Sequence, residues 1–460
     1  MNDYLKIKIL GLGSNKKINR TRVVQAGIIL AGGIAMFAFF QMKYPYHFYF
    51  QEQEQLFLMD WEYMRGYFGT EKWGGFARLV GDFLTQFYYY MFAGAAILMG
   101  MLLIVGDLAR RAAESVIRLF VKSENAVCSW IAFAVGLSVM CICMMMSFDH
   151  TFRLSNLVSI AGLCLFVWLS FWLFGKFKMR KAKFIGILAC IPFLYLFMPQ
   201  KGDFKGKIGG PELDFERLLA YDNEYYFGHY NRVIEMGRED SEKMTEEMSY
   251  FYCMALEKMG ALADMLPTMK NPNLGTFYKI GEDTPRFVIR MMNEMYYLIG
   301  DMTYTERAAL LANTFSRDGR SARMVKRLAE ANLVNGDVPA AMKYLRLLEK
   351  TIVYRRWAKA HMPGSMTAAV EAEIAEKAKY INTSDSIRIG DNCYTILTQL
   401  LDSNPDNAVA LDYLLCSDML SRQRDTFVMD YEKYGPSDRG IFREVYGEPH
   451  PSPPQGEGDR

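Results

Sequence analysis

The sequence has little histidine and cysteine for its length. Five His and eight Cys are scattered through 460 residues, and their spacing is not typical of a metal site or a disulfide framework. The formal net charge is only +2, which excludes a strongly basic nucleic-acid-binding protein. A Gly-rich phosphate-binding loop is also lacking. The sequence therefore predicts no metal, no cofactor and no nucleic-acid partner.

Charged residues are absent from five long segments. Their ranges are 23–42, 83–106, 125–148, 154–175 and 184–200. Because about 20 helical residues cross a hydrocarbon core of roughly 30 Å, the first four are predicted to span a membrane. The fifth has only 17 residues and contains Pro192, so a re-entrant or interfacial segment is the alternative to a fifth span.

The small net charge hides two oppositely charged halves. The chain carries 20 basic and 11 acidic residues before Pro199, and 30 basic and 39 acidic residues from Glu212 onward. Such asymmetry indicates two bodies in different surroundings. The predicted parts are a basic N-terminus (1–22), a transmembrane domain (23–200), a Gly/Pro linker (201–211), a helical domain (212–446) and a disordered, proline-rich tail (447–460).

The basic residues that flank the spans predict an orientation. With the N-terminus in the cytoplasm, 15 Lys and Arg fall in inside segments and five in the two short outside loops. This bias follows the positive-inside rule. An odd number of spans would then carry everything after Gln200 to the opposite side of the membrane.

The first outer loop, residues 43–82, is predicted to be amphipathic. Phe57, Trp61, Met64 and Phe68 recur at helical spacing, which predicts a helix of about four turns with an apolar stripe. Such a helix could lie flat on the outer leaflet.

The same loop holds three candidate catalytic residues, Glu52, Glu54 and Asp60. Carboxylates at this place could act as a general base or metal ligand for a lipid-linked substrate. The simpler interpretation, which we favour, is that they solvate the polar face of a surface helix. Neither a His/carboxylate spacing nor a phosphate loop accompanies them.

The second half shows helical periodicity and few alternating β-branched runs. Turn signals such as Gly300-Asp301 and Gly336-Asp337 separate helices of ordinary length, which predicts stacked helical hairpins. Two stretches resemble tetratricopeptide repeats. Their predicted packing residues are Leu328, Ala329, Ala341, Leu345 and Leu348 in the first and Leu411 and Leu414 in the second. The second stretch departs from the repeat pattern, with Leu415 in place of a small residue and Asp418 in place of a tyrosine.

Three sequence stretches resemble an uncharacterised family of bacterial integral membrane proteins, a domain of unknown function. They are FYFQEQEQLFLMDWEYM (48–64), GGFARLVGDFLTQFYYY (74–90) and RLAEANLVNGDVPAAMKYLRLLEKTIVYRRWA (327–358). The resemblance implies a Gram-negative inner membrane with the helical domain in the periplasm. It carries over no catalytic residue.

The expected fold is all-α: about five membrane helices followed by a soluble, tetratricopeptide-like α-solenoid. We expect a membrane-anchored interaction or scaffolding protein of the cell envelope, in contact with the lipid bilayer and with a protein or peptide partner. The alternative is a membrane-embedded transferase for a lipid-linked sugar, which would use Glu52, Glu54 or Asp60. A disulfide between Cys393 and Cys416 is possible, although buried thiols are the default.

Overall fold

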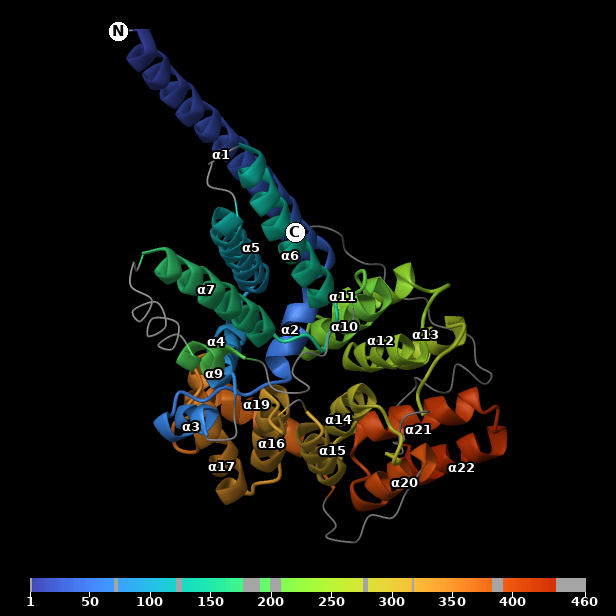
Figure 1. The fold of residues 1–460 in the computed structure, drawn as a ribbon. Coiled ribbons are helices and arrows are strands. Elements are labelled where there is room, and N and C mark those ends of the chain that lie inside the picture. The colour runs from blue at the N-terminus through green and yellow to red at the C-terminus, as the bar shows by residue number, and fades with distance from the viewer. Residues whose placement is uncertain are drawn as a thin grey trace. The chain divides into compact units, whose positions relative to one another are not determined.

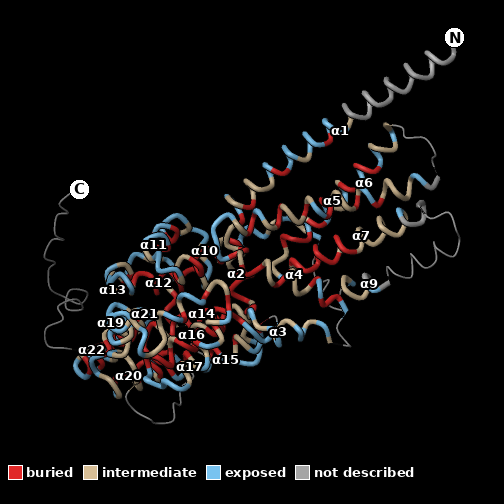
Figure 2. Tube along the Cα trace, turned by 90° about the vertical axis from the view of Figure 1, so that its left-hand side faces the viewer, coloured by how far each residue is buried: buried red, intermediate tan, exposed pale blue. Residues whose placement is uncertain are grey.

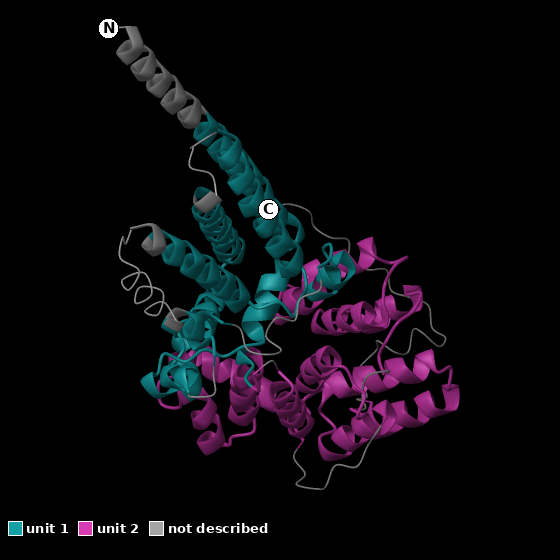
Figure 3. Ribbon diagram, in the orientation of Figure 1, with its two compact units in different colours: residues 1–219, 320–322, 347–357 teal, residues 220–319, 323–346, 358–460 magenta. Residues whose placement is uncertain are grey.

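The computed structural model describes residues 2–69, 73–120, 126–176, 191–198, 208–275, 280–316, 318–382 and 392–435. Every regular element in these ranges is a helix (Figure 1), and this confirms the predicted all-α fold. The chain forms two compact units (Figure 3). Unit 1 comprises residues 1–219, 320–322 and 347–357, and unit 2 comprises residues 220–319, 323–346 and 358–460.

Unit 1 contains four long apolar helices. They are α1 (Asn2–Lys43), α5 (Ala93–Phe120), α6 (Ala126–Ser147) and α7 (Leu154–Lys176). Each includes a stretch long and apolar enough to cross a membrane, and together they indicate a membrane protein. Of the predicted fifth span, only α9 (Ile191–Phe197) and the residue after it are described, because residues 177–190 and 199–207 lie outside the described ranges.

The predicted start of the second span, at Phe83, is wrong. The charge-free run first completes helix α4 (Gly75–Thr85) and the 3-10 helix η2 (Gln86–Tyr89). The backbone then turns at Phe92, whose φ is 69°, and α5 begins at the next residue. A charge-free run indicates apolar surroundings but does not locate the ends of a helix. Here the run extends across a turn between two helices.

The helix α2 (Tyr46–Gln53) opens the first loop and is capped from far along the chain. Glu216, on α10 (Leu213–Tyr226), accepts hydrogen bonds from the backbone N–H of Tyr46 at 2.6 Å and of His47 at 3.0 Å. Two acceptor oxygens are favourable there, because the first amide groups of a helix lack partners within it. The contact joins the start of the loop to the segment that follows the membrane helices.

The predicted four-turn helix from Phe57 to Phe68 is also wrong. The loop instead forms the short α3 (Trp61–Arg65) and the 3-10 helix η1 (Gly66–Phe68). Asp60 caps α3 from an extended conformation, so the helix cannot begin earlier. Phe57 is 4% exposed, whereas Trp61 is 76% exposed, and the apolar residues therefore do not share one face.

An aromatic core joins the membrane helices of unit 1 to the loop. Phe40 and Tyr44 from α1, Phe48 from α2 and Phe148 after α6 are all buried, and their rings are in contact, Tyr44 edge to face with both Phe40 and Phe148. The Tyr44 hydroxyl donates to the Phe148 carbonyl at 2.8 Å, which satisfies the one polar group of the cluster. Figure 2 shows this buried region where α1 and α2 meet.

Unit 2 is built from shorter helices that follow one another in pairs. They are α11 (Tyr230–Glu239), α12 (Glu246–Lys258), α13 (Leu262–Met265), η3 (Leu266–Thr268), α14 (Arg286–Ile299), α15 (Met302–Thr314), α16 (Ala322–Val334), α17 (Val338–Glu349), α18 (Arg355–Ala360), α19 (Ala368–Ala378), α20 (Cys393–Ser403), α21 (Ala408–Leu420) and α22 (Arg424–Tyr434). The first residues of α16 and α18 and the last residues of α17 belong to unit 1. The predicted turns at Gly300 and Gly336 have φ of 85° and 76°, a conformation that favours glycine.

The predicted packing positions of unit 2 are confirmed. Leu328 and Ala329 on α16, Ala341 and Leu345 on α17 and Leu411 on α21 are all buried. Cys393 and Cys416 are buried free thiols, so the possible disulfide is not formed.

Candidate functional site

The three carboxylates of the first loop occupy different environments. Glu52, on α2, is 2% exposed, and its Oε2 accepts a hydrogen bond from the Tyr354 hydroxyl at 3.0 Å. Tyr354 is itself buried and makes an edge-to-face contact with Tyr89. Glu52 therefore holds residues 347–357 against the loop within unit 1.

Asp60 contacts the same stretch from the outside of the loop. Its Oδ2 lies 2.6 Å from the Lys350 Nζ, and the backbone N–H of Met59 donates to the Lys350 carbonyl at 2.7 Å. The other oxygen of Asp60 accepts from the backbone N–H groups of Glu62 and Tyr63. The hydrogen bond from Lys350, followed by those from the backbone, lowers the pKa of Asp60. A general base works best with a pKa near the operating pH. The lowered pKa of Asp60 therefore does not favour a role as general base.

These carboxylates are not gathered around a common point that could hold a metal. Within the described ranges, no group of three or more His, Cys, Asp and Glu side chains has the geometry of a metal site. Glu54 is buried at the C-cap position, directly after α2. Glu52 and Asp60 thus serve contacts within unit 1.

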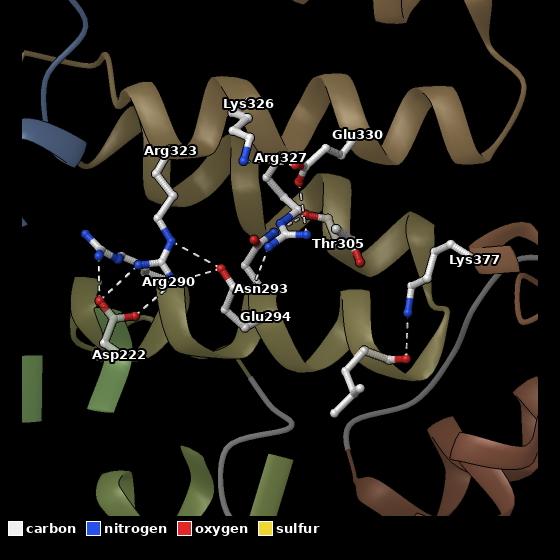
Figure 4. A network of polar contacts seen from close by, with 11 residues as sticks. Asp222, Arg290, Asn293, Glu294, Thr305, Arg323, Lys326, Arg327, Glu330 and Lys377 are labelled. Carbon is white, nitrogen blue, oxygen red and sulfur yellow. Dashed lines mark hydrogen bonds and ion pairs between the residues drawn. The ribbon is translucent and has the colours of Figure 1, made fainter. Parts of the chain in front are cut away.

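A second polar cluster, which we call the ion network, lies in unit 2 (Figure 4). It contains Asp222 from α10, Arg290 and Glu294 from α14, and Arg323 and Arg327 from α16. All five side chains are buried. Buried ions are tolerated when they are paired and hydrogen-bonded, and every member here has an oppositely charged partner.

Arg323 is the centre of the ion network. Its Nη2 lies 2.8 Å from Glu294 Oε1 and 2.9 Å from Asp222 Oδ1. Arg290 donates to the same Asp222, and Arg327 to the same Glu294. Burial alone would raise the pKa of Glu294, but Arg327 and Arg323 outweigh it and lower that pKa to about 2. Glu294 is therefore a permanent anion at neutral pH.

Aromatic rings complete the ion network. The guanidinium carbon of Arg323 lies 4.1 Å from the centre of the Tyr226 ring, and that of Arg327 lies 3.9 Å from the Tyr297 ring. These are favourable cation–π distances. The arrangement ties α10, α14 and α16 together through three arginines.

Lys377, at the end of α19, is a further cation near Arg327 of the ion network. Its Nζ donates to the Leu298 carbonyl at 2.8 Å and so caps the C-terminus of α14, where a cation is favourable. Removal from water, followed by the cations Lys258 and Arg327, lowers the pKa of Lys377 well below its usual value. Because its nitrogen already serves as this cap, its evident role is to position α19 against α14.

The ion network was not predicted from the sequence, although α14 carries a signal for it. Arg290 and Glu294 are four residues apart in RFVIRMMNEMYYLI, a helix that is otherwise almost wholly apolar. A helix that is apolar on all sides is buried on all sides. Opposite charges within such a helix must therefore find their partners in the protein interior. The spacing could have identified the pair on α14, but not the partners on α10 and α16.

Comparison with known proteins gives one match. Residues 19–200 and 181–448 match a family of unknown function (DUF6057). No curated protein and no solved structure matches the chain.

Proposed function

This chain belongs to the DUF6057 family, whose function is unknown, and we propose that it is a membrane-anchored interaction protein. Its helical unit 2, the tetratricopeptide-like part, would bind a protein or peptide partner at the outer face of a bacterial inner membrane. The observation that carries the proposal is the paired arrangement of the helices in unit 2, together with the ion network that ties α10, α14 and α16. Stacked helical pairs form extended binding surfaces, and a rigid frame keeps such a surface in shape.

The state of the loop carboxylates supports an interaction role over catalysis. Glu52 is buried against Tyr354, and Asp60 is bound by Lys350. Both are engaged in contacts that hold unit 1 together. The net charge of −9 from Glu212 onward favours a basic partner.

Contacts of the first loop support a five-span topology. The loop binds Glu216 through Tyr46 and binds Tyr354 through Glu52. Segments that touch lie on the same side of a membrane. Because four crossings return a chain to the side of its N-terminus, an additional crossing before Glu216 is needed to bring these partners to the loop. The sequence-predicted span at 184–200 is the candidate for it.

Reporter fusions test this topology. Alkaline phosphatase, which is active only in the periplasm, is fused after Lys207 and, as a control, after Ser123 in the predicted inside loop. We expect activity from the first fusion and none from the second. An inactive fusion at Lys207, with the protein present in membranes, would contradict the periplasmic placement of unit 2.

Photo-crosslinking in intact cells tests the interaction role. A photoreactive amino acid is placed at Phe315, which is 57% exposed at the end of α15, and at the exposed Val338 of α17. The matched control is Ile34, exposed on α1. We expect both unit 2 positions to capture the same protein, identified by mass spectrometry and recovered by reciprocal purification. Capture of that protein equally from Ile34, or of none from either unit 2 position, would contradict the proposal.

A further inference from the structure

A polar hollow of about 470 Å³ lies between the membrane helices of unit 1. Its walls include Arg22 and Gln25 of α1, Arg110 and Arg111 of α5, and Trp168 of α7. Arg22 directly precedes the charge-free run 23–42, and Asp107, another residue of the wall, directly follows the run 83–106. The hollow therefore lies at the ends of the apolar stretches, where basic and tryptophan side chains meet lipid head groups.

The charges around the hollow leave one cation in excess. Asp107 lies 2.6 Å from both Arg110 and Arg111, and Glu114 lies 2.7 Å from Arg110. Two carboxylates thus face three arginines. Arg22 is exposed and forms no ion pair within the described ranges.

Gln25 and Arg111 are held in place before any ligand binds. Gln25 is buried, and its amide nitrogen donates to the Ser129 carbonyl and hydroxyl at 3.3 Å. The guanidinium carbon of Arg111 lies 5.6 Å from the centre of the Trp168 ring. Arginines ordered in this way lose little freedom when they bind a phosphate, whose oxygens match the guanidinium fork.

An apolar pocket of about 30 Å³ adjoins the hollow. The two share Ile29, Asp107, Arg110 and Phe133 in their walls. The smaller pocket is otherwise bounded by apolar or glycine residues, among them Leu103 and Met140. A molecule that lies across both would need a polar, anionic end joined to an apolar end.

We propose that this hollow binds the phosphate-bearing head group of a membrane lipid. Arg22 and Arg111 bind the phosphate, Trp168 covers one side of it, and the adjoining pocket takes the first carbons of the apolar part. The bilayer supplies such a molecule at this level, whereas a soluble phosphate compound offers nothing to the apolar pocket. The site is independent of the partner surface on unit 2.

Three matched probes test the assignment on the purified full-length protein in a neutral detergent. Phosphatidic acid has both the phosphate and the chains, diacylglycerol lacks the phosphate, and glycerol 3-phosphate lacks the chains. Native mass spectrometry measures which of them is retained. We expect retention of phosphatidic acid alone.

Substitutions then test the residues. Because a basic residue near an anionic lipid surface contributes about 1 kcal/mol, or roughly fivefold in affinity, Arg22→Gln should weaken phosphatidic acid binding about fivefold. The double variant Arg22→Gln with Arg111→Gln should weaken phosphatidic acid binding about 25-fold, if each arginine contributes the same amount. The control is Arg118→Gln. It removes one positive charge from α5, the helix of Arg111, at a position outside the hollow, and it should leave phosphatidic acid binding unchanged.

Three results would overturn the proposal. Equal binding of diacylglycerol would remove the role of the phosphate, and displacement of the lipid by an equal concentration of glycerol 3-phosphate would assign the hollow to a soluble compound. An equal loss from Arg118→Gln would mean that the charge of the surface, rather than the hollow, binds the lipid. Thermal unfolding of each variant, measured alongside, confirms that the binding data refer to folded protein.

Discussion

Tyr354 and Glu52 are 302 positions apart, yet the tyrosine hydroxyl donates to the glutamate Oε2 at 3.0 Å in a buried contact. The bond connects α2, which follows the first membrane helix, to a stretch just beyond α17. Two of the three stretches that resemble the membrane protein family, 48–64 and 327–358, therefore meet at this point. Folding of unit 1 consequently requires a segment from late in the chain.

Removal of this hydroxyl should destabilise unit 1. Tyr354→Phe deletes the donor while it retains the ring that contacts Tyr89. We expect a loss of about 1 to 3 kcal/mol, because a buried carboxylate oxygen loses its partner. The measurement is thermal unfolding of the full-length protein in detergent, and Tyr344→Phe, on the partly buried face of α17, is the matched control. Equal stability of the two variants would show that the bond has no net effect.

Isosteric substitutions separate structure from chemistry in the loop carboxylates. Glu52→Gln and Asp60→Asn remove the charges but keep oxygen acceptors for Tyr354 and for the N-terminus of α3. We expect normal amounts of protein in the membrane and full complementation of a gene deletion. The control is Glu62→Gln in the same loop. Loss of complementation at normal protein levels, from Asp60→Asn or Glu52→Gln only, would restore the transferase alternative.

Periodicity identified the helices of unit 2 because packing in paired helices is mostly local. The turn at Gly336 and the buried Leu328 and Leu345 follow from residues close in sequence. The first loop was harder to predict. Its apolar spacing fitted one long helix, but Phe57 instead packs against Tyr63 and Phe83. Its position is decided by tertiary contacts, which outweigh local propensity.

The candidate site shows the same limit. The carboxylates Glu52 and Asp60 were visible in the sequence, but their partners Tyr354 and Lys350 lie about 300 residues away. A spacing rule cannot find partners across that separation. The ion network was missed for the same reason, since Asp222 and Arg323 are 101 positions apart.

Glu294 is the anion whose loss should harm unit 2 most. Glu294→Gln leaves Arg323 and Arg327 buried without their shared counter-charge. Removal of one partner from a buried ion pair typically costs about 3 to 5 kcal/mol. We expect a loss of that size in chemical unfolding of the full chain, whereas Glu371→Gln, exposed in the first turn of α19, should change stability little. A neutral effect of Glu294→Gln would mean that Asp222 and Glu330, which also pair with Arg323 and Arg327, supply enough counter-charge.

A pair of acidic residues gives unit 2 a pH dependence. Asp418 on α21 and Asp430 on α22 are both buried, and their carboxyl groups interact electrostatically. Burial, followed by the negative charge of Asp430, raises the pKa of Asp418 to about 7. Asp418 is the residue that stands where the tetratricopeptide pattern has a tyrosine. Its carboxyl group is thus held protonated in the folded protein at a pH at which it would ionise in the unfolded chain.

The sign of the pH effect follows from proton binding. Between about pH 4, the unfolded pKa of an aspartate, and pH 7, the folded state binds more protons than the unfolded state. Stability should therefore fall as the pH rises through this window and level off above it. Asp418→Asn removes the ionisation, so it should flatten that slope and stabilise the protein at pH 8 by about 1 to 3 kcal/mol, since each pH unit between the two pKa values is worth about 1.4 kcal/mol. Thermal unfolding at pH 5 and pH 8 measures both effects, with Glu432→Gln, exposed on α22, as the control. If Asp418→Asn keeps the pH slope of the unaltered protein, the acidic pair is not its source.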